Sequence, residues 1–464
     1  MLAATINENI KTVRIGCGQG FWGDWLDAPK RLVESGDLDY LILDYLAEVT
    51  MSILAKQKAK NPQLGFGRDL PGLLCSFGEK IVAGKLKVVT NAGGLNPLLC
   101  AEACLAQFRE KFPQYALPKI AIVTGDDLIA DLPSHLSAGE KFEHLESQLP
   151  ISTVLPDIKS MNAYIGVESV VDALNQGAQI VLTGRIADPA MCLAPLISEF
   201  GWDLNDWDKL ASGIVAGHII ECGSQSTGGN YSYNWEQVPN PWDIGYPIVE
   251  CAEDGSFVVT KPAGTGGLVT EQSVIEQLVY EIADPQNYIT PDVVVDFTTI
   301  RVQAVASDRV HVSGATGKQK PAKLKISGTY HSGFKAEGTL ILVGPKVLQK
   351  AAICKAMVEK RLAHKQLCFE ELLFENIGNF SCIPGMAEKQ LYPEPGELLF
   401  RVAVRDPDKN NVEQFTREIA PLVLSGPSGI TGYAGGKAEV KEVISFWPCL
   451  IDRTKVATAW RFVE

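Results

Sequence analysis

The stretch KLKVVTNAGGLNPLLCAEACLAQFREKF, residues 85–112, indicates the fold class of this chain. An apolar run at Leu86–Thr90 leads through a glycine-containing turn into a helical pattern over Pro97–Phe112. Asn96 directly before Pro97 fits a helix N-cap followed by proline at the first helical position. A buried strand that passes through a short turn into a helix is half of a βαβ unit. The stretch therefore predicts a parallel sheet covered by helices.

The same alternation of short apolar runs and helical periodicity continues on both sides of this stretch. We therefore expect an α/β domain over residues 1–240 with a Rossmann-like parallel sheet and glycine-rich turns at its strand ends. A β/α barrel is the nearest alternative and would keep the functional turns at the same ends of the strands. The further expected strands are Val13–Gly16, Asp39–Leu43, Lys119–Val123 and Gln179–Thr183, and the further helices are Leu46–Lys58, Val167–Asn175 and Pro189–Phe200.

The pattern changes after a Pro- and Gly-rich stretch at Gln237–Tyr246. Strand-like segments (VVVDFTTIRV, RVHVSG, AKLKISGTY and FKAEGTLILVG) follow one another closely between Asp292 and Gly344, which favours antiparallel pairing. We expect an α+β domain over residues 241–464 that has an antiparallel sheet and completes the cleft. Its later elements are expected at Pro345–Leu362 (helix), Glu397–Val404 (strand), Val412–Leu424 (helix), Ala438–Phe446 (strand) and Val456–Phe462 (strand).

Composition excludes several classes of function. The net charge is −13, and no short segment gathers lysines and arginines, which argues against a nucleic-acid partner. No apolar run is long enough for a membrane helix, and the N-terminal residues lack the pattern of a secretory signal. The 11 cysteines form no C-x-x-C pair and the six histidines no H-x-x-x-H pair. We therefore expect a cytoplasmic protein without a metal site.

Four turns that follow expected strands carry the candidate site residues, because ligands of open α/β sheets bind outside the carboxyl ends of the strands. Asp24 ends the first turn and Asp188 lies in the turn after the fifth strand, and these two carboxylates are the candidate catalytic groups. Both Asn96 and Asp188 precede a proline and are expected to be N-caps. The ligand-binding candidates in these turns are Gly18, Gly20, Asn91, Gly93, Gly94, Asn96 and Arg185.

Arg185 is the best-placed cation of these turns. It follows a strand directly and lies beside an expected helix start, so a guanidinium fork and free backbone N–H groups would meet the same anion. We expect Arg185 to bind the carboxylate or phosphate of a ligand.

The segment ECGSQSTGGN, Glu221–Asn230, is expected to be a loop of hydroxyls and amides that approaches a ligand. His218 and Cys222 are four residues apart and would share a helix face, so a Cys–His nucleophile is an alternative. We do not expect Cys222 to be a nucleophile, because no carboxylate is evident to orient His218. The ligand-binding candidates of this segment are Ser224, Thr227, Gly228 and Asn230.

Two glycine-rich motifs suggest nucleotides without meeting their full patterns. Gly18, Gly20 and Gly23 form G-x-G-x-x-G, and Asp44 follows about 20 residues later, where a dinucleotide site has its ribose-binding acid. The bulky Phe21 and Trp22 and the short segment behind them argue against that site, so we expect no redox cofactor. The run Ser425–Lys437 lacks the G-K-[ST] of a P-loop, but it leaves open a nucleotide-dependent transferase.

Taken in order, these segments resemble the AtuA family of acyclic terpene utilisation proteins. The matching stretches are GCGQGFWGD (residues 16–24), DYLAEVT (44–50), NAGGLNP (91–97), GRIADP (184–189) and ECGSQSTGGN (221–230). The resemblance implies a role in the breakdown of branched acids as coenzyme A thioesters. Some members carry an additional C-terminal domain of ferredoxin-like fold, and we expect this chain to stop before it and a small partner to supply that part. The resemblance transfers no catalytic residue.

Three functional hypotheses remain open from the sequence. The first is an enzyme of lyase or hydratase type that acts on a carboxylic acid or its CoA thioester. In it, the amides of Gly93–Gly94 or Gly228–Gly229 hold an enolate oxyanion, and Asp24 or Asp188 moves the proton. Coenzyme A would be part of the substrate only. The second is a non-catalytic binding subunit that works with a small partner, and the third is the transferase. We expect a homo-oligomer in each case.

Overall fold

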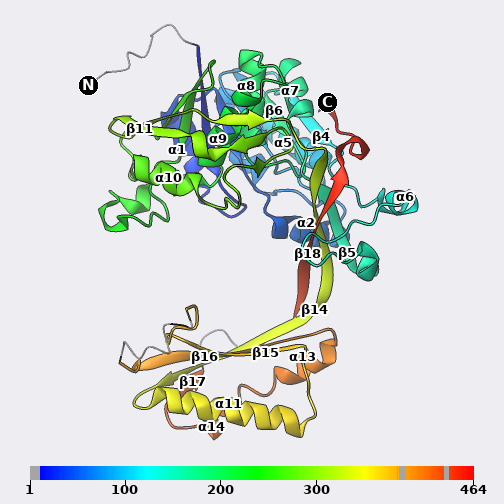
Figure 1. The fold of residues 1–464 in the computed structure, drawn as a ribbon, viewed down its shortest axis with the longest axis vertical. Coiled ribbons are helices and arrows are strands. Elements are labelled where there is room, and N and C mark those ends of the chain that lie inside the picture. Colours follow the sequence, from blue (N-terminus) through cyan, green and yellow to red (C-terminus); the bar gives the residue numbers. More distant parts are fainter. Residues whose placement is uncertain (1–10, 384, 386–392, 433–437) are drawn as a thin grey trace. The chain divides into compact units, whose positions relative to one another are not determined.

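The computed structural model describes residues 11–383, 385, 393–432 and 438–464 (Figure 1). These residues form two compact units. The first comprises Met1–Thr329 with Phe446–Glu464, and the second comprises Tyr330–Ser445. The chain leaves the first unit within strand β14 (Lys323–Val343) and re-enters it within strand β18 (Lys441–Asp452).

The first unit is built around a mixed sheet whose described strands run in the order β11-β12-β8-β7-β1-β2-β3-β6-β4-β19. The central strands β1, β2, β3, β6 and β4 are mutually parallel. Each of these strands overlaps a strand expected from the sequence. A strand that is buried on both faces has a continuous apolar run, and this run is the pattern from which it was predicted. Their bounds are Thr12–Gln19 (β1), Tyr40–Leu43 (β2), Lys87–Thr90 (β3), Ile120–Thr124 (β4) and Ile180–Leu182 (β6).

Crossover direction decides which face of this sheet each helix covers. The chain steps one way from β1 through β2 and β3 to β4, and right-handed crossovers then place the connecting helices on one face. The hydrophobic cluster on that face draws on α1 to α5. The step back from β4 to β6 reverses direction, and no described residue of α7, α8 or α9 belongs to that cluster. The bounds are Asp27–Gly36 (α1), Glu48–Lys60 (α2), Leu70–Ser76 (α3), Gly78–Val82 (α4), Pro97–Lys111 (α5), Glu168–Asn175 (α7), Ala190–Phe200 (α8) and Trp207–Ile220 (α9).

Antiparallel strands extend this sheet at both edges. β7 (Ile248–Ala252) pairs with β1, and β8 (Phe257–Thr260), β12 (Arg309–Ser313) and β11 (Arg301–Ala306) follow it outward. The C-terminal β19 (Ala459–Val463) pairs with β4. Strands on both sides of residue 240 therefore share one sheet.

The expectation of a mixed α/β protein with parallel strands is thus confirmed. The Rossmann-like assignment is not confirmed, because the parallel order β1-β2-β3-β6-β4 differs from the 3-2-1-4-5-6 order of dinucleotide-binding sheets. The order of the two expected domains is not confirmed either. A smaller antiparallel sheet joins β13 (Thr316–Lys318), β10 (Val294–Asp296) and β9 (Tyr288–Ile289).

Among its described residues, the second unit has the element order β14-α11-β15-β16-α13-α14-β17-β18, which contains the connectivity β-α-β-β-α-β. Its antiparallel sheet has the order β15-β16-β14-β17, with β18 also paired to β14, which is the split βαβ arrangement called ferredoxin-like. Buried residues of β16 alternate along the strand and face α11, as expected for a sheet covered on one side. The bounds are Val347–His364 (α11), Glu371–Ile377 (β15), Glu397–Asp406 (β16), Lys409–Phe415 (α13), Leu422–Ser425 (α14) and Ile430–Gly432 (β17).

Three expectations for this part of the chain are corrected. The segments AKLKISGTY and FKAEGTLILVG are one strand, β14, rather than two. The helix expected at Val412–Leu424 is divided into α13 and α14. A ferredoxin-like connectivity lies within the chain itself, so the expected small partner stays a prediction and is not required to supply one. Of the glycine run Ser425–Lys437, residues 433–437 lie outside the described residues, and Ile430–Gly432 is strand β17.

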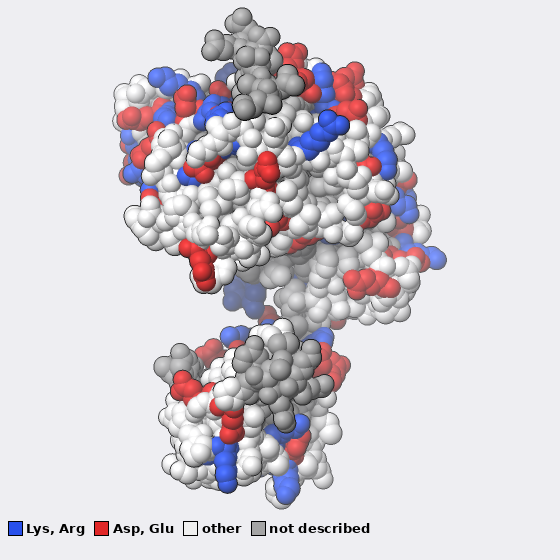
Figure 2. All heavy atoms as spheres, turned by 60° about the vertical axis from the view of Figure 1, so that its left-hand side comes forward, with Lys and Arg blue, Asp and Glu red and all other residues white. Residues whose placement is uncertain are grey.

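Within the described ranges, none of the helices has the length and apolar character needed to cross a bilayer. On the face shown in Figure 2, basic and acidic side chains are interspersed. The remaining elements include β5 (Ile158–Ala163), which pairs with β14, α6 (Leu132–Ser137) and α10 (Glu271–Leu278).

Candidate functional site

The helices that follow two neighbouring parallel strands, β3 and β6, lie on opposite faces of the sheet. β3 continues into α5 on one face, and its neighbour β6 continues into α8, which lies outside that face's core. Such a switch point opens a crevice outside the carboxyl ends of the two strands. The turns that flank it are residues 91–97 and 184–189. The turn with Asp24 follows β1, which is parallel to them, so it lies at the same end of the sheet.

A hydrogen-bonded group of side chains spans these strand ends. Asn91, fully buried after β3, donates from Nδ2 to Asp44 Oδ1 (2.8 Å) and accepts from the Tyr45 amide (2.7 Å). Asp44 follows β2 directly and also accepts from the Leu46 amide (3.0 Å). The sequence analysis considered Asp44 only as a ribose-binding acid. The strand-end rule, applied to β2, is the signal that identifies it.

Arg185 is buried in this crevice, with its side chain 2% exposed. Its guanidinium pairs with the Asp188 carboxylate, donates to the Ile186 carbonyl (3.2 Å) and stacks over the Tyr164 ring (4.2 Å to the centroid). Its Nε has no partner among the described residues. Asp188 does not cap α8, since that helix begins at Ala190 without a side-chain cap. Its carboxylate is instead held by Arg185.

A cavity of about 290 Å³ opens beside this pair. Arg185, Lys323 and Lys325 bring three positive charges to its wall, and Asp188 and Glu281 bring two negative ones. An excess of positive charge in a chain of net charge −13 favours an anionic ligand. The aromatic lining is formed by Tyr164 and Tyr288. Of the residues expected from the sequence to form the site, Arg185 and Asp188 line this cavity.

A second titratable pair lies close by, at the end of α9. His218 Nδ1 is 3.0 Å from Glu221 Oε1, and the two side chains are 2% and 11% exposed. The rings of Tyr288 and Phe297 pack against the imidazole at 5.6 and 5.5 Å between centroids. The expectation that no carboxylate orients His218 is wrong, because Glu221, three residues further along the chain, does so.

The charge of Asp188 acts on two buried carboxylates of this region, Asp44 and Glu221. Burial and the nearby charge of Asp188 raise the pKa of Asp44 well above its ordinary range, against the opposing effects of Arg185 and Asn91. Burial, with a further contribution from Asp188, raises the pKa of Glu221 to about 7, although His218 opposes the shift. A carboxylate whose charge shifts the titration of two buried neighbours is a common feature of acid–base sites.

Several buried polar atoms of this region lack a partner within the described residues. They include both amide atoms of the fully buried Gln19, at the end of β1, and Gln277 Oε1 on α10. Leaving a buried polar atom without a hydrogen bond costs about 1–3 kcal/mol. Such atoms in a native protein call for a polar occupant. No group of three or more His, Cys, Asp or Glu among the described residues is arranged to hold a metal ion.

The predicted residues of the first turn have structural contacts instead of cavity positions. Asp24 accepts from the Gly20 amide (3.0 Å), the Trp25 amide (2.7 Å) and the Tyr246 hydroxyl (2.6 Å), and so closes the turn. A Cβ at Gly20 would lie 2.8 Å from the Cys222 carbonyl carbon, and one at Gly18 would lie 2.9 Å from Pro29. Glycine is needed there for close packing of backbone and helix.

The turn after β3 is held in a similar way. A Cβ at Gly93 would lie 2.7 Å from the Thr183 carbonyl oxygen. Gly94 has φ of +53°, and its amide donates to Asn91 O (3.1 Å). Asn96 is the N-cap of α5, but its side chain donates to the carbonyls of Pro62 and Leu64 rather than capping the helix. The structure gives these residues a role in shaping the turn, and Asn91 alone joins the buried polar group.

The loop after Glu221 is also internally bonded. The Thr227 hydroxyl donates to Ser224 O (3.0 Å), and the Gly228 and Gly229 amides donate to Gln225 O (3.4 Å) and Ser224 O (2.8 Å). Asn230 has φ of +50° and is exposed. These amides and that of Gly94 are occupied by carbonyls, so we do not assign them to an oxyanion.

Cys222 follows α9 rather than extending it, since the helix ends at Ile220. Burial and the neighbouring Glu221 raise the pKa of its thiol to about 12, so it stays protonated at neutral pH. This agrees with the expectation that Cys222 is not a nucleophile. Cys100 and Cys104 on α5 are fully buried members of the core.

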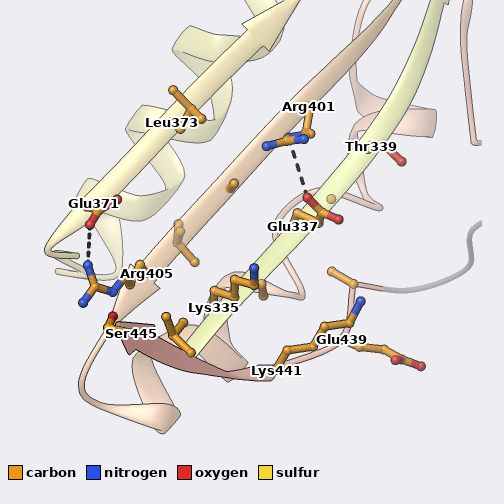
Figure 3. A pocket seen from close by; sticks show the side chains of 16 residues that line it. Lys335, Glu337, Thr339, Glu371, Leu373, Arg401, Arg405, Glu439, Lys441 and Ser445 are labelled. Carbon is orange, nitrogen blue, oxygen red and sulfur yellow. Dashed lines mark hydrogen bonds and ion pairs between the residues drawn. The ribbon is translucent and has the colours of Figure 1, made fainter. Parts of the chain in front are cut away.

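A larger cavity, of about 560 Å³, lies in the second unit on the sheet face away from α11 (Figure 3). Its two arginines are paired with carboxylates of the same sheet. Arg401 contacts Glu337 and Glu375, and Arg405 contacts Glu371. This is the pattern of a solvated sheet face that neutralises its own charge, and we assign no ligand to it.

The buried carboxylates predict how stability depends on pH. Burial raises the pKa of Asp126, which follows β4, from 3.8 to about 6, so the folded state binds this proton more tightly than the unfolded state. The stability it provides is present at low pH and is lost as pH rises through 6. The same sign applies to Glu221, to Asp292, with a pKa raised to about 6, and to His218, whose pKa is also raised. We expect the free energy of unfolding to fall between pH 5 and 8.

For Asp126 alone the fall between pH 5 and pH 8 is about 1.4 kcal/mol, because the rest of its shift acts below pH 5, and urea denaturation across this range measures it. Carboxylates with lowered pKa, such as Glu199 and Glu250, lose their contribution only at more acidic pH, outside this window. Asp126→Asn is the control, because it should remove the contribution of Asp126 to the pH dependence of the free energy of unfolding. A profile that is level or rises toward pH 8 would contradict the prediction.

Comparison with known proteins gives one family match. The family model described as "Acyclic terpene utilisation family protein AtuA" matches residues 13–462. Neither the curated proteins nor the solved structures gave a match.

Proposed function

Because the chain belongs to the acyclic terpene utilisation family AtuA, we propose that it is an enzyme of lyase or hydratase type. It acts on a small carboxylic acid or on the CoA thioester of one, in the cavity beside Arg185 and Asp188. Its residues need no redox cofactor for this chemistry, because only a proton and water are moved. The observation that carries the proposal is the cavity at the switch point, with its excess positive charge and its buried ion pair.

Asp188 is the residue that moves the substrate proton in this proposal. It lines the cavity, and its side chain is 33% exposed, whereas Asp44 and Glu221 do not line the cavity and their side chains are less exposed. Arg185 holds the carboxylate in place and leaves it accessible. Asp24, the other expected proton carrier, has both carboxylate oxygens in hydrogen bonds that close its turn, which favours a structural role.

Side chains, not backbone amides, stabilise the developing oxyanion in this proposal. Burial and the surrounding carboxylates raise the pKa of Tyr288 well above its ordinary value, so its hydroxyl remains a donor. Lys323 and Lys325 supply positive charge to the same wall. Preorganised donors and cations aimed at developing charge are the usual source of such stabilisation.

A thermal-shift screen tests the proposal against its alternatives. The probes are short acyl-CoAs, free 3-hydroxy acids, and ATP with magnesium. We expect an acyl-CoA or a hydroxy acid to raise the melting temperature, because binding to the folded state adds free energy in proportion to ligand occupancy. Lys323→Ala should weaken that binding several-fold. Lys320→Ala is the matched control, because Lys320 pairs with Glu168 outside the cavity lining.

The other outcomes are informative. A shift with ATP and none with acids would favour the nucleotide-dependent transferase. Binding of acids with no turnover by the chain alone, but turnover after addition of a co-purifying small protein, would favour the binding-subunit hypothesis. Equal affinity in Lys323→Ala and Lys320→Ala would place the anion elsewhere.

A further inference from the structure

The pair His218–Glu221 keeps unused hydrogen-bonding capacity toward the candidate site. His218 uses Nδ1 for Glu221, while its Nε2 has no partner among the described residues, and neither has Glu221 Oε2. An ion pair with a purely structural role would be expected to satisfy its buried atoms. Two unpartnered atoms on one buried pair therefore point to a further polar group that meets it.

The surroundings of the pair connect it to the cavity. Tyr288 lines the cavity and at the same time packs on the His218 ring. The charge of Asp188 acts on Glu221, so the two carboxylates belong to one electrostatic site. Gln277 fixes the pair from α10 by donating to the His218 carbonyl (3.0 Å).

We infer that Glu221, supported by His218, is a second proton-carrying group of this site and acts behind Asp188. The inference rests on the proposed function. Glu221 is a positioning residue that serves the cavity through water or Tyr288, because its side chain does not line the cavity wall. A pKa near neutrality, as burial and Asp188 produce for Glu221, suits a group that both takes up and releases a proton.

Dehydration of a 3-hydroxy thioester needs two such groups. Asp188 takes the proton from the α-carbon, and the electron pair of that C–H bond moves onto the thioester carbonyl to give an enolate, whose return forms the carbon–carbon double bond. The bond from the β-carbon to the hydroxyl oxygen then breaks, a proton passes from Glu221 to that oxygen through an intervening water, and the oxygen leaves as water. Hydration is the reverse. The balance requires no reactant besides water, and the first step can be observed without the second.

The experiment separates these steps with 3-hydroxybutyryl-CoA as the probe in deuterated water. We expect the native protein to exchange the α-hydrogens and to form crotonyl-CoA. Glu221→Gln keeps the hydrogen bond to His218 but carries no proton, so it should retain exchange while dehydration falls by about 10²–10⁴-fold, the usual contribution of a general acid. Glu253→Gln is the matched control, because it removes an exposed carboxylate outside the cavity lining, and it should retain both steps.

Dehydration at the native rate in Glu221→Gln would overturn the inference, and so would equal loss of exchange and dehydration. Absence of both steps in the native protein would instead count against the proposed function. Infrared titration tests, without any substrate, whether Glu221 holds a proton near neutral pH. A protonated carboxyl band that disappears near pH 7, and that is missing from Glu221→Gln, is expected. Absence of that band in the native protein would overturn the inference.

A second variant, His218→Gln, keeps the inference testable if Glu221→Gln does not fold. His218→Gln can still donate to Glu221 but removes the imidazolium that favours the carboxylate, so the infrared midpoint of Glu221 should move to higher pH. An unmoved midpoint would contradict the support assigned to His218. The titratable groups that face Glu221 and enter this interpretation are His218, Asp188, Cys192, Cys222, Glu281 and Tyr288.

Discussion

Arg185→Ala is expected to lower the free energy of unfolding by about 3–5 kcal/mol, the usual cost of removing one partner from a buried ion pair. The guanidinium is buried and compensates Asp188 directly and Asp44 through its field. Without it, the carboxylates of Asp188 and Asp44 would repel each other with no counter-charge. Equilibrium urea denaturation at pH 7 measures the effect.

Three further variants give this prediction its controls. Arg185→Lys should recover only part of the stability, because an ammonium cannot match the guanidinium fork or its stacking over Tyr164. Arg185→Ala combined with Asp188→Ala should be less destabilised than the sum of the single variants, since the second change removes the stranded charge. Arg461→Ala, on the exposed side of β19, should change stability by less than about 0.5 kcal/mol. Arg185→Ala with native stability would show that the pair is solvated.

The sequence predicts that Arg185 binds an anionic ligand. The structure explains why the sequence alone cannot distinguish this role from an ion pair within the protein. A strand-end arginine beside a proline is the same pattern whether it faces a ligand or an aspartate three residues on. What decides is the start of α8, one residue later than expected, which frees the Asp188 carboxylate from capping. Lys323 and Lys325, which bring further positive charge to the cavity, come from a strand 138 and 140 residues further along the chain.

The parallel strands and their turns could be predicted because local hydrophobic periodicity encodes them. The buried partners could not, because they depend on tertiary contacts. Asp44 meets Asn91 only when β2 and β3 pair, and Tyr288 reaches the cavity from a two-residue strand that has no strong pattern. The pairing of Glu221 with His218 could have been predicted from the sequence. Residues spaced i,i+3 at a helix end are neighbours, and this spacing was not considered for the two side chains.

The glycines of these turns show what a sequence pattern leaves open about function. Gly18, Gly20, Gly93 and Gly94 were predicted to contact a ligand because glycine allows close approach. In the structure the groups that approach them are Pro29, the Cys222 backbone, the Thr183 carbonyl and the Gly65 carbonyl. Sequence shows that a side chain is excluded at such a position. It does not show whether protein or ligand excludes it, since both impose the same steric limit.

The second large effect is expected for Asp188→Asn, which should lower turnover of the acyl-CoA or hydroxy acid identified in the screen by about 10²–10⁴-fold. The amide has the same shape and can still accept from Arg185, but it cannot take a proton from the substrate. It also removes one negative charge from a cavity that binds an anion. KM should therefore stay level or fall while kcat collapses, which is the pattern of a group needed only in the transition state.

The same substitution has an effect that a merely structural role would not produce. Asp188 helps to raise the pKa of Glu221 to about 7 and that of Asp44, so its neutralisation should shift the titration of both carboxylates to lower pH. Infrared spectroscopy of the carboxyl bands follows that shift in the absence of substrate. Glu281→Gln, the other carboxylate on the cavity wall, should keep kcat within a few-fold of the native value. If Asp188→Asn turned over substrate as fast as Glu281→Gln, the proton would have to be moved by another group, and Asp188 would serve only to neutralise Arg185.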